Sequence, residues 1–130
     1  RIVRPNYWQT SNDNTVALSI TADQNNYSPT SAELTHYWKV TTDASRTVTG
    51  ISWAALVPEQ GSPAINGWDL TISNVGAQNL VLANASASSD ADKRIITGTG
   101  ANLTVAAGQT VQLIYDADGT TPRWRVLKNA

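Results

Sequence analysis

The chain has 130 residues and a mass of 13.9 kDa, which suffices for one domain with a real core but not for two. With 41% hydrophobic residues, 15% charged residues and a formal charge of −1, it is a folded, nearly neutral protein without the basic stripe that nucleic-acid binding needs. Zero cysteines exclude disulfides and thiolate nucleophiles, one histidine excludes a multi-histidine metal site, and no apolar run approaches the roughly 18 residues of a membrane span.

Short segments of alternating apolar and polar residues, bounded by Gly, Pro, Asn or Asp, follow one another along the whole chain. In chain order this alternation predicts strands over residues 15–20, 37–41, 47–53, 69–73, 79–83, 94–97, 103–105, 110–115 and 124–127. A spacing of roughly 8 to 12 residues predicts an all-β fold, an antiparallel β-sandwich or jelly-roll-like barrel of eight or nine strands. We expect residues 1–13 to form an N-terminal arm or connector and residues 14–130 a single β-sandwich domain.

The connections between these strands carry few helical signals. Residues 29–33 could form one helical turn, capped by Thr30 or Ser31. Residues 58–67 form a long irregular loop, and the small polar residues 83–92 predict a surface excursion between paired strands. Gly50 is expected to mark a bulge in the third strand.

The sequence contains few combinations of residues that could form a catalytic site. His36 is the single imidazole, so a Ser-His-Asp mechanism would have no other base. Glu33 and Glu59 are the two glutamates, and both fall in expected loops, where a glycosidase pair is a weaker interpretation than surface acids. We therefore expect no enzyme activity, no catalytic residue and no cofactor.

Metal sites have only weak sequence support. Asp90 with Asp92, and Asp116 with Asp118, place carboxylates two residues apart, as calcium loops do. Neither pair is followed by the remaining ligands of an EF-hand. We expect no resident metal, with a weak surface cation site as the alternative.

The aromatic residues are five Trp and four Tyr with no Phe, so every one carries a polar group that can meet water or a partner. Trp38 and Trp53 lie in strand patterns and are expected in the core. Alternation places Trp124 in the core as well, with Arg123 and Arg125 on the opposite face.

Five residues are the candidates for ligand or subunit contacts. Tyr7 and Trp8 precede the first strand, and Trp68 ends the long loop, so all three could face a sugar ring or a neighbouring subunit. Arg123 and Arg125 are expected to contact solvent or another subunit.

Several blocks of sequence occur in an order that resembles a β-rich structural module of tailed-bacteriophage virion surface proteins. They are residues 18–30, 41–51, 72–89, 94–95, 103–116 and 123–126, so the resemblance covers roughly residues 14 to 127. The loop at 58–67 and the aromatic-rich start, Pro5 to Trp8, depart from that pattern.

The resemblance implies a jelly-roll-type sandwich, commonly homotrimeric, that is displayed on the particle surface as a head or tail fibre knob or as a capsid decoration protein. Its partners would be two further copies, other virion proteins such as capsid or fibre shaft, and a bacterial surface glycan as a candidate host-attachment ligand. From the charge balance and the lack of a long apolar run we expect no nucleic-acid or membrane partner. The alternative is a carbohydrate-binding module that uses Trp8, Trp53 and Trp68 on a β-sandwich, since planar rings stack on sugars.

Overall fold

The computed structural model describes residues 14–57, 66–118 and 121–127, which fold into two β-sheets and two short 3₁₀ helices. Tyr7, Trp8 and most of the loop at 58–67 lie outside the described residues. The strands are β1 Thr15–Ile20, β2 Tyr37–Thr42, β3 Arg46–Val48, β4 Asp69–Asn74, β5 Leu80–Leu82, β6 Ile95–Ile96, β7 Leu103–Val105, β8 Thr110–Asp116 and β9 Arg123–Val126. The 3₁₀ helices are η1 Trp53–Ala55 and η2 Ala91–Lys93.

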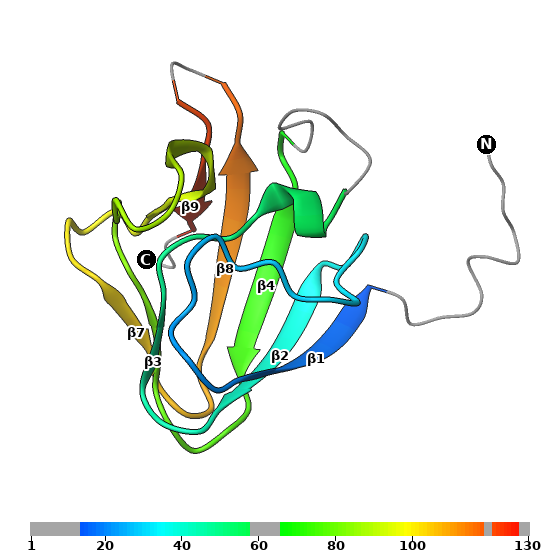
Figure 1. Ribbon diagram of the computed structural model, residues 1–130, viewed down its shortest axis with the longest axis vertical. Coiled ribbons are helices and arrows are strands. Elements are labelled where there is room, and N and C mark those ends of the chain that lie inside the picture. Colours follow the sequence, from blue (N-terminus) through cyan, green and yellow to red (C-terminus); the bar gives the residue numbers. More distant parts are fainter. Residues whose placement is uncertain (1–13, 58–65, 119–120, 128–130) are drawn as a thin grey trace, which may run out of the picture.

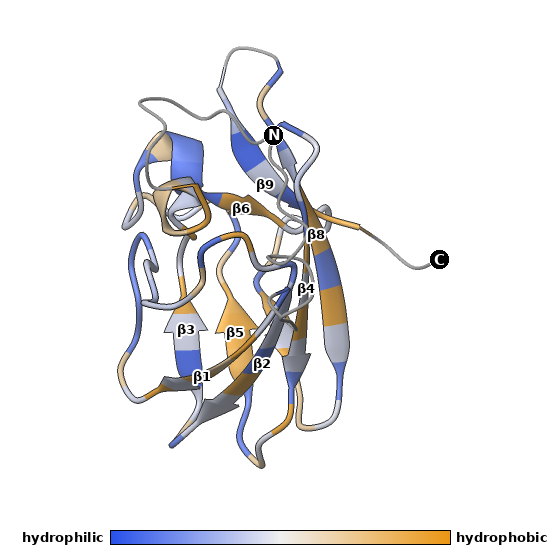
Figure 2. Ribbon diagram, turned by 90° about the vertical axis from the view of Figure 1, so that its right-hand side faces the viewer, coloured by the Kyte–Doolittle hydropathy of each residue, from blue (hydrophilic) through white to orange (hydrophobic). Residues whose placement is uncertain are grey.

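The larger sheet has the order β1-β2-β4-β8-β9-β6, and the smaller sheet has the order β3-β5-β7. Figure 1 shows β1, β2, β4 and β8 side by side, with β3 and β7 in the other layer. Val40 and Ile72 of the larger sheet and Val48, Leu80 and Leu82 of the smaller sheet belong to the same buried cluster. The core therefore lies between the two sheets, and β5 is apolar along its whole length (Figure 2).

The antiparallel prediction is wrong for more than half of the ladders. Strands β1, β2 and β4 pair in parallel, as do β3 with β5 and β6 with β9, whereas β4–β8, β5–β7 and β8–β9 are antiparallel. The parallel pairs among β1, β2 and β4 arise because, after each strand of the larger sheet, the chain crosses to the smaller sheet and then returns to form the next strand of the larger sheet. It runs from β1 through the bridge residues Gln24 and Tyr27 to β2, from β2 through β3 to β4, and then to β5. The result is three stacked coils. Beyond the last coil, the antiparallel strands β7 and β8 pair with β5 and β4, and β9 pairs with β8.

Strand positions follow the sequence closely. β1 and β7 have the expected bounds, and along β1 the residues Val16, Leu18 and Ile20 share the inward face. The third strand ends at Val48 and is therefore shorter than expected. After it, Gly50 and Ile51 form single bridges, and Trp53 begins η1. A Cβ on Gly50 would lie 2.5 Å from Ser89 Oγ and 2.6 Å from the Lys93 carbonyl oxygen, so glycine is required by close packing rather than by a bulge.

Two loop expectations need correction. Residues 29–33 contain turns but no helical residue. The loop at 83–92 lies at the surface as expected, since Ser88 and Asp90 are exposed, but it joins β5 and β6, which belong to different sheets and do not pair. Within it, Ser89 is 2% exposed and its Oγ accepts a hydrogen bond from the Asn26 backbone N–H at 2.8 Å. Ser89 Oγ also lies 2.7 Å from Thr49 Oγ1, so the loop is packed down onto the coils.

Candidate functional site

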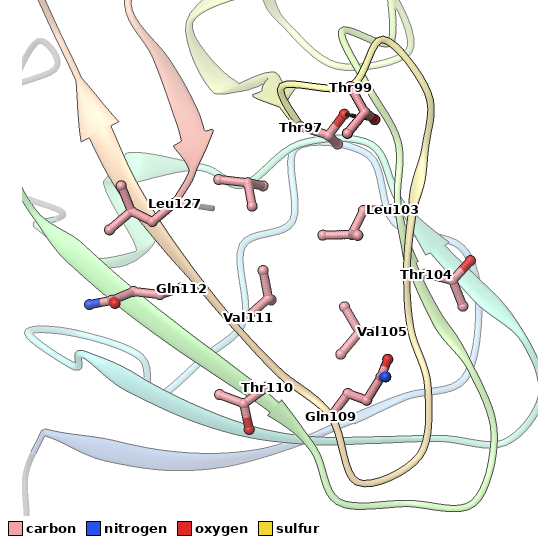
Figure 3. A pocket seen from close by; sticks show the side chains of 11 residues that line it. Thr97, Thr99, Leu103, Thr104, Val105, Gln109, Thr110, Val111, Gln112 and Leu127 are labelled. Atoms are coloured by element: carbon pink, nitrogen blue, oxygen red, sulfur yellow. Dashed lines mark hydrogen bonds between the residues drawn. The ribbon is translucent and has the colours of Figure 1, made fainter. Parts of the chain in front are cut away.

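A groove lies between β7 and β8, where the two sheets separate. Its volume is about 370 Å³. Leu103 and Val105 of β7 and Val111 of β8 point into the same space, while Thr104 points away from it (Figure 3). The complete lining is Thr97, Thr99, Leu103, Thr104, Val105, Gln109, Thr110, Val111, Gln112, Val126 and Leu127.

The groove exists because β7 and β8 are consecutive strands that belong to different sheets. Their connection turns tightly at residues 106–109, where the Gln109 N–H donates to the Ala106 carbonyl at 2.9 Å and Gly108 adopts a φ of +84°. The smaller sheet ends at β7, but the larger sheet continues through β8 and β9. The inward residues Val111 and Val126 are consequently only partly covered.

The chemistry of the groove is neutral. Valine and leucine side chains form its interior, threonine and glutamine form its rim, and none of its lining residues is charged. Leu127 is 41% exposed at one side of it. An apolar interior with hydroxyl and amide groups around it suits an uncharged protein segment, which can bury apolar side chains and bond to the rim.

Two sheet edges are open among the residues that the structure describes. The outer side of β1 has no strand partner there, and neither does the outer side of β7. The other two edges are covered: Gln24 and Tyr27 bridge to Val48 and Ile51 beyond β3, and Asn84 bridges to Ile95 in β6. Both open edges are uncharged, since β1 reads TVALSI and β7 reads LTV.

Trp68 is partly exposed, but one of its faces is already occupied. The His36 ring stacks on it with 4.3 Å between the centroids and 10° between the planes. Trp68 Nε1 donates to the Thr35 carbonyl at 3.1 Å, and His36 Nδ1 lies 2.8 Å from the Asp69 carbonyl oxygen and 3.3 Å from Asp69 Oδ1. Stacking and hydrogen bonding thus hold Trp68 in one orientation. A ligand could reach only the part of the ring that His36 does not cover.

Arg123 and Arg125 do not form a common site with Trp68 through any contact among the described residues. Arg125 is exposed and its Nε donates to Asp116 Oδ2 at 2.7 Å, while Arg123 is partly buried and its Nε donates to the Thr121 carbonyl at 3.3 Å. Hydrogen bonding from Arg125 is the largest cause that lowers the pKa of Asp116. Trp124 between them is 0% exposed, so the predicted alternation is confirmed.

Trp53 is unsuitable as an open sugar platform because it is only 8% exposed. Its Nε1 donates to Asp92 Oδ2 at 3.1 Å, and Lys93 Nζ lies 5.5 Å from the centre of its ring. Lys93 Nζ also contacts Asp92 Oδ1 at 3.2 Å and Asp90 Oδ2 at 3.5 Å. The core predictions for Trp38 and Trp53 are confirmed. Asp90 and Asp92 both pair with Lys93 of the same chain.

At the ends of β8 and β9 that lie away from the groove, buried aromatic residues fill the core. Tyr115 and Trp124 pack edge to face with 5.0 Å between ring centres. The Tyr115 hydroxyl donates to the Asp92 carbonyl at 2.6 Å, and Trp124 Nε1 donates to the Ile51 carbonyl at 2.9 Å. Burial, followed by the nearby Asp92 carboxylate, raises the pKa of Tyr115.

Sequence reasoning missed the groove and the two open edges. The available signal was the size of the inward residues: valines occupy the inner positions of β8 and β9 nearest the turn, and aromatic residues occupy the inner positions farther along. Glu59 lies outside the described residues, so its distance from Glu33 is undefined. Within the described part of the chain, no helix is long and apolar enough to cross a membrane.

Comparisons with protein-family models, with curated proteins and with solved structures find no match to this chain. Function is therefore inferred from the groove, the sheet edges and the ordered sequence blocks.

Proposed function

We propose that this chain is a non-enzymatic structural module that works by assembly, as a surface component of a bacteriophage particle. The observation that carries this proposal is an uncharged apolar groove beside a sheet edge at β7 that has no strand partner among the residues that the structure describes. Natural proteins usually guard such edges with charges, proline or bulges, because an open edge invites another chain. An edge left unguarded beside apolar side chains suits a protein that is buried in an assembly.

The virion location is supported by the resemblance of the ordered blocks between residues 14 and 127 to tailed-phage surface modules. That resemblance favours a homotrimer, as a fibre knob or a capsid decoration protein, although the parallel pairing of β1, β2 and β4 departs from the antiparallel jelly roll that it also implies. The partners would be two further copies and a capsid or fibre-shaft protein, with a bacterial surface glycan as a candidate ligand. The protein would be made in the host cytoplasm and reside on the outside of the particle.

The first test is the mass of the native protein by light scattering at micromolar concentration. Three chains of 13.9 kDa each are expected. A single-chain mass at every concentration would contradict the trimer.

The second test concerns location. Particles purified from the producing host should contain the chain by mass spectrometry, and gold-labelled antibodies should bind to their surface in electron micrographs. Particles that lack the chain, or that hide it from antibody while intact, would contradict a surface component.

A carbohydrate-binding module is the second candidate, because Trp68 is partly exposed and held rigidly by His36 and Thr35. A preorganised ring loses little freedom when a sugar stacks on it. A glycan array should then show binding by the wild type and at least tenfold weaker binding by Trp68→Ala. Equal signals from both proteins, or none from either, would end this candidate; Trp53 is too buried to replace Trp68.

A further inference from the structure

The turn that leads into β4 contains the single Asn-Gly sequence of the chain, Asn66–Gly67. It lies beside the end of β8, because the pairing of β4 with β8 begins with Asp69 opposite Ile114 (Figure 1). Asn66 and Gly67 are both exposed, and a Cβ on Gly67 would meet nothing within 4 Å. Solvent therefore reaches both residues, and no side chain shields the main-chain nitrogen of Gly67.

An asparagine followed by glycine can react with its own main chain. The nitrogen of Gly67 gives up its proton and attacks Cγ of Asn66, a C–N bond forms, and the bond from Cγ to Nδ2 breaks as Nδ2 takes up a proton and leaves as ammonia. The product is a cyclic succinimide. One water molecule then opens the ring on either side, which gives aspartate or isoaspartate at position 66. Glycine favours the attack because it adds no side chain and leaves the main chain free to turn.

Three hydrogen bonds hold the reacting groups of this turn. The Gly67 N–H donates to the Tyr115 carbonyl at 2.7 Å, so the attacking nitrogen keeps its proton. Asn66 Oδ1 accepts from the Ala117 N–H at 2.9 Å, and Asn66 Nδ2 donates to Asp118 Oδ2 at 3.4 Å. The third bond is the longest and therefore the weakest. The nitrogen of Gly67 is thus fastened to β8, and the side chain of Asn66 to the residues that follow β8.

The two shorter bonds work against the reaction. The attacking nitrogen must lose its proton and approach Cγ of Asn66, so both bonds have to break first, which requires local opening of the turn. Tyr115 is 0% exposed, and its own N–H donates to the Trp68 carbonyl at 2.9 Å. The core therefore fixes the position of the carbonyl that holds Gly67.

We propose that Asn66 is a deamidation site that the folded protein keeps inactive through these hydrogen bonds. The reaction consumes only water and proceeds when the turn opens. An aspartate product places a second carboxylate against Asp118, and an isoaspartate product adds one carbon to the main chain directly before Gly67. Either product weakens the contact between this turn and the end of β8. The proposal does not depend on the proposed function.

The first experiment compares the wild type in the folded state and in guanidinium chloride, at the same mildly alkaline pH and temperature. Mass spectrometry of the peptide that contains Asn66 resolves the exchange of its NH₂ group for OH. Conversion in guanidinium chloride should be at least tenfold faster, because the hydrogen bonds no longer hold the reacting groups. Equal rates in the two states would overturn the protection, and no conversion in guanidinium chloride would overturn the site itself.

The second experiment removes one of the bonds. Ala117→Pro deletes the N–H that donates to Asn66 Oδ1, whereas Ala117→Ser keeps that N–H and is the matched control. In the folded state, Ala117→Pro should convert about fivefold faster than Ala117→Ser, the factor that corresponds to one hydrogen bond of about 1 kcal/mol. In guanidinium chloride the two variants should convert at the same rate. Equal rates in the folded state would refute the role of the Ala117 N–H.

A third measurement uses only the wild type and covers the case in which Ala117→Pro does not fold. The Gly67 N–H exchanges with deuterium from the solvent when its bond to Tyr115 opens, and NMR follows this exchange. Low concentrations of guanidinium chloride that leave the fold intact should raise the exchange of this N–H and the deamidation of Asn66 by the same factor. Deamidation that stays constant while exchange accelerates would contradict the proposal.

Discussion

The two ends of β8 and β9 differ in one property, the size of their inward side chains. At one end, Tyr115 and Trp124 reach across to the opposite layer and bond to the carbonyls of Asp92 and Ile51. At the other end, Val111 and Val126 occupy the equivalent inward positions, and a groove remains. The same two strands thus close the molecule at one end and leave it open at the other, because long aromatic side chains span the gap between layers and valines do not.

The largest expected effect comes from removing the aromatic closure. Trp124→Ala deletes a fully buried ring and its hydrogen bond to Ile51, so unfolding free energy should fall by about 3–5 kcal/mol. Val126→Ala on the same strand removes a partly exposed side chain and should cost about 1 kcal/mol or less. Urea unfolding of both variants at one protein concentration checks the difference; equal losses would mean that the two ends are equally packed.

Gly50→Ala tests how tightly the closed end is packed against the 83–92 loop. The new methyl group would meet Ser89 Oγ and the Lys93 carbonyl oxygen, both within 2.6 Å, so the loop must move. We expect a loss of about 1–3 kcal/mol in unfolding free energy. Gly67→Ala, where a Cβ has open space but φ is +83°, is the control for backbone strain alone; a larger loss there than at Gly50 would contradict the packing explanation.

Tyr115→Phe keeps the ring of the closed end and removes only its hydroxyl. Loss of the hydrogen bond to the Asp92 carbonyl should cost about 1 kcal/mol at neutral pH. Because burial raises the pKa of Tyr115, the unfolded chain gives up this proton at lower pH than the folded chain. The wild type should therefore lose stability as the pH rises above the ordinary value of 10.0, and Tyr115→Phe should lose less. Identical losses in urea titrations at pH 9 and pH 11 would contradict this assignment.

The smallest effect is expected on the outer face of the closed end. Arg125→Gln removes the hydrogen bond that lowers the pKa of Asp116, so this pKa should rise toward its ordinary value of 3.8. The pair is solvent-exposed, and the urea midpoint should stay unchanged at neutral pH. Carboxyl NMR titration measures the pKa, and a large shift of the midpoint would show that this end depends on its surface ion pair as well as on its core.

The candidate residues show where prediction from sequence succeeded. Trp124 was placed in the core and Arg125 outside it by alternation alone, and the structure agrees. Trp53 was expected in the core and is buried, so it no longer supports sugar binding. The groove was missed because its walls, β7 and β8, are adjacent in sequence, and such strands usually form one hairpin in one sheet. The small inward valines of β8 and β9 were the signal that could have indicated it.

The amino-acid sequence by itself determined where most strands begin and end and which side chains turn inward, since period-two alternation is a local property of an extended chain. It also determined that the open edges would be neutral, because β1 and β7 contain no charged residue. Only the tertiary structure decided which strands pair and in which direction. Alternation is the same in parallel and antiparallel sheets, whereas the choice of partner depends on contacts between residues far apart in the chain, and these contacts create the coils, the closed end and the groove.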